Sequence, residues 1–252
     1  MSSRKPFGAS DLEELDACLF SRAARVVPMR DVFKGDRASD VIALRHDVDD
    51  NPGSLDTALR MAEWEFDHGY SSTYYLLHGS HYWGEECFVA AERLVELGHE
   101  VGLHNNAIAE AFRQKRDPLT ILAEALAELR ASVPVYGVVA HGDDLCYIDK
   151  VLGTLRFVND EVFSESPRPN LGAASRIVYR GDVAVVIEPV PRHEFGIEYD
   201  AAWLPRDNYL SDSWGLWSQP LEAVAEAFGR GQLHVLQHPD WWSHAFMERL
   251  VA

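Results

Sequence analysis

Apolar residues recur with two different periods along most of this chain. Residues 41–45 are β-branched and apolar, as in a buried strand, and from Ser54 to Gly69 apolar residues recur every three or four positions, as in a helix. The same alternation predicts further strands at residues 72–77, 100–103, 133–140 and 233–237, and helices at residues 86–97, 118–131 and 221–228, with a last helix through Phe246 and Leu250. Because strands that alternate with helices form parallel sheets, this order predicts an α/β fold, either an open sheet or a barrel.

The alternation stops after Tyr147. Residues 175–179 and 183–187 are two β-branched segments separated by a short turn with Gly181, which predicts a β-hairpin inserted into the main fold. Residues 164–174, rich in Pro, Ser, Asn and Gly, are expected to form a loop before it. Since α/β barrels of about 200–250 residues routinely form one domain, we expect residues 1–252 to be a single domain.

Composition and charge narrow the classes of partner. Hydrophobic residues make up 47% and charged residues 25% of the chain, which suits a folded protein with a substantial core. The formal net charge of −17 repels nucleic acid and anionic membrane surfaces, so neither is an expected partner. No apolar run follows the first residues, so we expect no secretory signal, no membrane span and a cytoplasmic protein. Three widely spaced cysteines, Cys18, Cys87 and Cys146, are expected to be free thiols.

Acidic residues and histidines collect where the predicted strands end. Asp47 and Asp49 follow the first strand, His104 and His141 follow two later ones, and His238 follows the last. Because the carboxyl ends of parallel strands face one common side, we expect these side chains to converge there.

The two carboxylates after the first strand point to a metal ion beside a general base. If the extended conformation continues, Arg45, Asp47 and Asp49 lie on one face. Neighbouring carboxylates repel each other unless a cation or a proton is shared between them, and this predicts Asp49 as a metal ligand and Asp47 as the base. The alternative interpretation is an acidic turn in which Asp50 caps the next helix.

The histidines suggest which ion would bind. Imidazole together with carboxylate suits zinc, with manganese, cobalt and nickel as alternatives, better than calcium or magnesium. We expect His104 to be one ligand, whereas His141 is a third ligand, a contact to substrate or base, or a structural residue. A second arrangement that uses His78 and His81 stays open.

His238 is the candidate general acid, because Pro239 restricts the backbone after it and holds the imidazole at the rim. The alternative is a histidine packed beneath Trp241. Flat indole faces stack on sugar rings, so Trp241 and Trp242 are candidate substrate-binding residues. The other candidates for substrate contact are Arg45 and Asn105.

In order along the chain, several short segments resemble the polysaccharide deacetylase family, also called carbohydrate esterase family four, and its subset that opens with His-Asp-Val-Asp. The similar segments are residues 45–49, 65–69, 72–75, 98–104, 140–142 and 238–242. The resemblance implies a distorted, seven-stranded-type (β/α) barrel and a metal-dependent N-deacetylation. It also implies Asp47 as the base, Asp49 and His104 as metal ligands, and His238 as the group that protonates the leaving amine.

The chain departs from the family pattern at two places. The usual second motif carries another histidine four residues after His104, and Ile108 occupies that position here. His141 or a water is the candidate replacement. The arginine that normally braces the base has no clear counterpart near residues 139–141, and Arg45 is the candidate substitute.

These features lead to one expected activity and two rivals. We expect metal-assisted hydrolysis of the acetamide of an amino sugar, sugar nucleotide or lipid-linked glycan, in the synthesis of an O-antigen or other envelope polysaccharide. The rivals are another metal-dependent C–N hydrolase, such as a deaminase or cyclic amidase, and an inactive carbohydrate-binding relative. The sequence leaves the sugar, the metal and the oligomeric state open.

Overall fold

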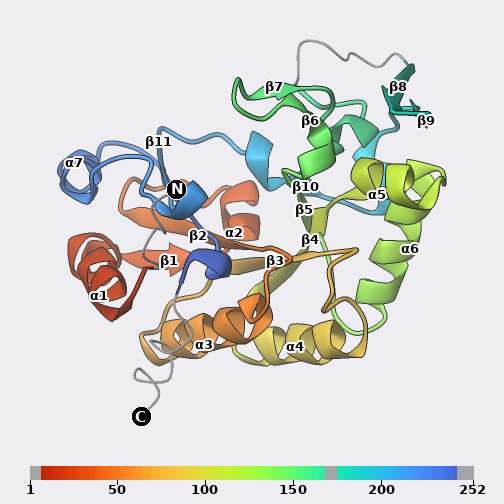
Figure 1. The fold of residues 1–252 in the computed structure, drawn as a ribbon. Helices are drawn as coiled ribbons and strands as arrows, with labels where there is room; N and C mark the ends of the chain where they lie inside the picture. Colours follow the sequence, from red (N-terminus) through yellow and green to blue (C-terminus); the bar gives the residue numbers. More distant parts are fainter. Residues whose placement is uncertain (1–6, 168–174, 243–252) are drawn as a thin grey trace.

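The computed structural model describes residues 7–167 and 175–242 and is built around one curled parallel sheet (Figure 1). Seven strands follow one another in the order β10-β5-β4-β3-β2-β12-β11, and β1 pairs with β2 outside this path. The strands are β1 (Arg25–Val27), β2 (Val41–Val48), β3 (Thr73–Leu77), β4 (Glu100–Asn105), β5 (Gly137–Ala140), β10 (Tyr199–Asp200), β11 (Asn208–Ser211) and β12 (Leu233–Gln237). Every neighbouring pair is parallel. The sheet is a half-barrel, which confirms the expected α/β, barrel-like fold.

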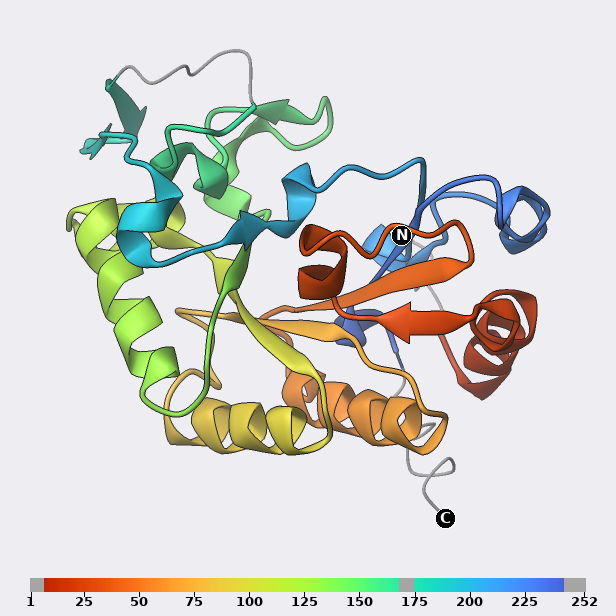
Figure 2. The same ribbon diagram turned by 180° about the vertical axis from the view of Figure 1, so that it is seen from behind.

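Most helices cover the outer face of the sheet, whereas the short helix at residues 29–33 packs on the inner face with Val41 and Ala43. Figures 1 and 2 place α3 and α4 side by side along one side of the sheet, with α5 and α6 at one end. The helices are α1 (Ala9–Cys18), α2 (Met29–Phe33), α3 (Ser54–Asp67), α4 (Glu85–Glu96), α5 (Ala107–Gln114), α6 (Pro118–Arg130) and α7 (Leu221–Ala227). None of the helices in this part of the chain is both long and apolar enough to cross a bilayer.

The inward-facing residues of strand β2 change from apolar to polar along the strand. All eight of its residues are buried, and alternation sends Ile42 and Leu44 into the helix-covered core. Val41 and Ala43 point inward, where they pack with Tyr75 and other residues of the inner core. The next inward positions are polar, so the interior changes from apolar to charged toward the carboxyl end of the strand.

Two glycines make room for the aromatic residues of the inner face. A Cβ at Gly102 would lie 2.3 Å from the ring of Tyr75, and one at Gly137 would lie 2.3 Å from the ring of Tyr199. The two tyrosines meet through a hydroxyl–hydroxyl hydrogen bond of 3.1 Å. Replacement of either glycine would therefore displace the layer directly beneath the polar end of the interior.

Several elements differ from the expectation. Helix α5 and the short strands β1, β10 and β11 were not anticipated, and β5 begins at Gly137 rather than at residue 133 because Val133 and Val135 pack as a buried loop. Strands β8 (Arg176–Arg180) and β9 (Val183–Ile187) pair antiparallel, and a smaller pair is formed by β6 (Tyr147–Asp149) and β7 (Thr154–Leu155). All three cysteines are free. The predicted helix through Phe246 and Leu250, and residues 168–174 of the predicted loop, lie outside the described residues.

Candidate active site

Three potential metal ligands meet at the carboxyl ends of neighbouring strands. Asp49 directly follows β2, His104 lies near the end of β4, and His141 directly follows β5. Asp49 Oδ1 lies 3.2 Å from His104 Nε2 and 3.0 Å from His141 Nδ1, and the two ring nitrogens are 3.1 Å apart. Within residues 7–167 and 175–242, these three form the one group of such side chains close enough to share an ion.

Because His104 donates to the backbone, this group has more hydrogen-bond acceptors than donors. Its Nδ1 lies 3.1 Å from the carbonyl oxygen of Val139, which only accepts, so Nδ1 must donate and Nε2 presents a lone pair to the cluster. Asp49 Oδ1 is also an acceptor. His141 Nδ1 can donate at most one proton, so it cannot satisfy both of these acceptors. A divalent cation would accept these lone pairs and remove the repulsion between them. The three side chains therefore fit a metal.

Asp49 and His141 each favour the charged form of the other. Burial alone would raise the pKa of Asp49, but His104 and His141 hold that pKa well below its usual range. Burial lowers the pKa of His141, and the neighbouring Asp49 more than compensates, so the pKa of His141 is raised. Asp49 is therefore ionised throughout the neutral range, as a candidate metal ligand must be.

Asp240 holds the segment that carries Asp49. Its carboxylate accepts from the backbone N–H of Asp49 (3.1 Å), from Asn51 Nδ2 (2.8 Å) and from the hydroxyl of Ser54. This ties the end of β2 and the start of α3 to the segment after β12. Sequence reasoning quoted Asp240 within a motif and gave it no role.

Asp47 and Arg45 form a buried ion pair beneath the cleft. Arg45 Nη2 lies 3.5 Å from Asp47 Oδ2, and the other carboxylate oxygen, Oδ1, is buried without a hydrogen-bond partner within the described structure. Burial lowers the pKa of Arg45, but the Asp47 carboxylate together with Tyr209, Tyr75 and Asp200 outweighs this effect and raises that pKa. Arg45 is not among the residues that line the cleft, and the contact that it makes is with the candidate base.

His238 is oriented by Asp212, a residue that the sequence analysis missed. Nδ1 of His238 lies 2.7 Å from Asp212 Oδ1, and the backbone N–H of His238 also donates to Asp212. Burial lowers the pKa of His238, but the hydrogen bond and charge of Asp212 outweigh it and raise the pKa to about 9. Asp212 directly follows β11, so recognition of that four-residue strand would have revealed it.

Two residues that were expected to contact substrate are buried instead. Trp242 is buried, donates its indole N–H to Asp212 Oδ2 (2.8 Å) and stacks on Phe7 at 5.0 Å. Asn105 is also buried, where it donates to the carbonyl of Asn159 (2.8 Å) and accepts from a backbone N–H of α5 (3.0 Å). Neither residue lines the cleft, and both hold neighbouring segments in place.

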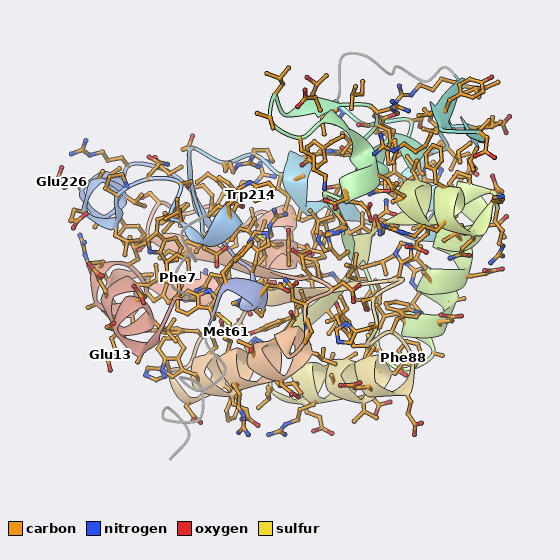
Figure 3. All side chains as sticks on the ribbon, viewed as in Figure 1. Phe7, Glu13, Met61, Phe88, Trp214 and Glu226 are labelled. Carbon is orange, nitrogen blue, oxygen red and sulfur yellow. The ribbon has the colours of Figure 1, made fainter. Side chains whose placement is uncertain are left out.

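A cleft of about 600 Å³ contains the candidate chemistry. Asp47, Asp49, His104, His141 and His238 all line it, together with Arg113, Tyr147, Trp214 and Trp241. Trp214 was not anticipated. Figure 3 shows this residue on the side of the sheet opposite Met61 and Phe88, which belong to the helix layer.

The alternative arrangements are not formed. His78 is buried with Nδ1 accepting from the backbone of Asn106 (3.3 Å), and burial lowers the pKa of His78 to about 4. His81 contacts Asp50 Oδ1 at 2.6 Å, and Asp50 does not cap α3, whose N-cap is Gly53. Neither histidine joins the Asp49 group.

No family model matches this chain, and no curated protein matches it. The fold and the site define the chain as a parallel α/β protein with a cleft that holds an Asp-His-His group.

Proposed function

We propose that this protein is a metal-dependent N-deacetylase of an acetylated amino sugar or of a polysaccharide precursor that contains one. The observation that carries the proposal is the joint placement of Asp47, the Asp49–His104–His141 group and His238 around one cleft. Amide hydrolysis needs a base, an electrophilic centre and an acid within reach of one bond, and this cleft provides residues suited to each task.

Asp47 is the proposed general base. The guanidinium of Arg45 lies 3.5 Å from Asp47 Oδ2, and Oδ1, which lacks a hydrogen-bond partner within the described structure, is available to accept a proton from the attacking water. When bound, a divalent cation supplies Lewis acidity toward the acetyl carbonyl and that water. Zinc suits one carboxylate and two imidazoles, with manganese, cobalt and nickel as alternatives.

His238 is the proposed general acid. Nδ1 is engaged by Asp212, so the proton to be delivered is the one on Nε2. The raised pKa of His238 keeps the imidazole doubly protonated at neutral pH. A nitrogen that leaves with its bonding electrons would otherwise be a poor leaving group, and this proton lets the amine depart.

The cleft suits a neutral carbohydrate. Trp214 and Trp241 offer flat apolar faces, and the net charge of −17 disfavours polyanions. A sugar nucleotide or lipid-linked glycan in envelope polysaccharide synthesis, acted on in the cytoplasm, is the substrate class that we propose.

Acetate release from zinc-supplemented protein with a panel of N-acetylated sugars tests this function. Asp47→Asn is expected to lower turnover by about 10²- to 10⁴-fold while metal content stays unchanged. Asp56→Asn, the same change at an exposed position on α3, is the matched control. Release of ammonia without acetate would favour another C–N hydrolase, and sugar binding that yields no turnover in the unmodified chain would favour a binding protein.

A further inference from the structure

Aliphatic side chains are exposed beside the cleft, on the hairpin formed by β6 and β7. Val151 is 94% exposed and Leu152 is 77% exposed, and Ile148 and Leu155 on the same hairpin are also exposed. Figure 1 shows this hairpin beyond β5, and His141 directly follows that strand in the chain. A cluster of exposed aliphatic residues next to a reactive cleft is typical of a binding surface.

Trp214 faces the same region from another segment. It is 68% exposed, and its backbone lies in the left-handed region at φ 65°, which is costly for a bulky side chain. Backbone strain of this kind is typical of functional sites, where the rest of the fold holds a side chain in a particular place. Leu216, two residues later, is exposed as well.

A groove of about 530 Å³ lies between the hairpin and Trp214. Val151, Leu152 and Leu155 line it from the hairpin. Gly142, Asp144, Tyr147 and Trp214 line both this groove and the catalytic cleft. The groove is therefore continuous with the place where the sugar would lie.

We propose that this groove binds an apolar chain, of the alkyl or prenyl type, attached to the sugar that is deacetylated. The inference rests on the proposed function and specifies its substrate class. The sugar occupies the cleft beside His141 and His238, and the attached chain leaves past Trp214 along the hairpin. Full burial of one methylene group strengthens binding about fourfold, so even partial cover of a long chain has a measurable effect.

Charge argues against an anionic membrane as the occupant. The hairpin carries one cation within the groove, Lys150, and its Nζ lies 2.5 Å from Asp144 Oδ1. The whole chain has a net charge of −17, which repels an anionic surface. Continuity with the cleft instead favours a chain that belongs to the substrate.

Calorimetric titration of the full chain with methyl and octyl N-acetyl-β-glucosaminide, the latter below its critical micelle concentration, tests the inference. We expect the octyl glycoside to bind at least about tenfold more tightly. The doubly substituted chain Val151→Ser with Leu152→Ser is expected to lose this preference and keep the affinity for the methyl glycoside. Val89→Ser is the matched control, since Val89 is 61% exposed on α4, in the helix layer.

Acetate release in the same samples separates this inference from the proposed function. Turnover of both glycosides with equal affinities would overturn the groove and leave the deacetylase standing, whereas an octyl preference without turnover would support the groove alone. Retention of the preference in the doubly substituted chain would overturn the groove. So would binding to phosphatidylcholine vesicles that depends on Val151 and Leu152 without an octyl preference, because it would assign the hairpin to a membrane contact.

Discussion

Each candidate reactive side chain is controlled by one neighbour. The carbonyl of Val139 determines which nitrogen of His104 faces the metal group, and the carboxylate of Asp212 determines the charge of His238. Arg45 is the neighbour of Asp47, with Nη2 3.5 Å from Asp47 Oδ2. Asp212 also accepts from the backbone N–H of His238 and from the indole of Trp242, so its replacement is expected to change stability as well as chemistry.

Asp212→Asn tests the control of His238. Loss of the negative charge is expected to lower the pKa of His238 from about 9 toward the ordinary histidine value, so the alkaline limb of the pH profile of kcat/KM moves to lower pH. The protonated fraction at pH 8 then falls roughly thirtyfold. Because the folded-state pKa is raised, the stability that this contact contributes is complete below about pH 6.5 and is lost as the pH rises through about 9. An alkaline limb that does not move would exclude His238 as the acid.

His141→Ala tests whether His141 is a ligand. We expect zinc affinity to fall by more than the roughly 10- to 100-fold typical of residues that only orient a ligand. His81→Ala is the control, since His81 contacts Asp50 outside the group. Unchanged zinc affinity in a chain that no longer turns over would assign His141 to substrate or base instead.

At the scale of secondary-structure elements, the short helix α5 and the end of strand β5 determine which residues form the candidate metal group. Helix α5 begins directly after β4, and its Ile108 is fully buried in the helix-side core. The position that holds a histidine in the deacetylase pattern is thus part of the hydrophobic packing here, while His141 approaches Asp49 from the end of β5. The ligand group is completed from a different strand.

Ile108→His is therefore expected to destabilise the protein without improving the site. A polar imidazole in this apolar setting should lower the free energy of unfolding by about 2–4 kcal/mol, with zinc affinity unchanged. Ile108→Val, expected to cost about 0.5–1.5 kcal/mol, separates loss of volume from loss of apolar character. Denaturant unfolding and zinc titration measure both effects, and a gain in zinc affinity at unchanged stability would contradict this account.

The sequence reveals the long elements and the reactive residues that follow them. Period-two alternation in β2 correctly predicts that Arg45 and Asp47 point the same way, and the strand ends correctly bring Asp49, His104 and His141 together. Strand β11 has four residues and β10 has two, too few for a periodic signal, and they form by pairing with β12 and β5. Because β11 was not predicted, its neighbours Asp212 and Trp214 were missed as well.

At the scale of the whole molecule, the metal group joins strands that are distant in sequence. One candidate ligand lies in or directly after each of β2, β4 and β5, so an ion held by all three would bind the folded chain and not the unfolded one. Ligand binding of this kind stabilises the folded state according to concentration and affinity.

Zinc is accordingly expected to raise the melting temperature, and a chelator to reverse the rise. At a zinc concentration of 100 times Kd the stabilisation is about 2.7 kcal/mol. Zinc requires neutral imidazoles, and the pKa of His141 in the metal-free chain is raised, so the stabilisation should decline as the pH falls through that raised pKa. Thermal unfolding with zinc and with chelator measures it, and His104→Ala should abolish the difference. A shift that survives this substitution would place the ion elsewhere.

Anomalous X-ray diffraction from crystals grown with zinc, recorded on both sides of the zinc absorption edge, tests the central claim most directly. We predict one strong peak within about 2.0–2.2 Å of Asp49 Oδ1, His104 Nε2 and His141 Nδ1. A crystal whose zinc peak lies away from these three atoms, or that has no peak among them, would contradict the metal centre and the hydrolytic function built on it.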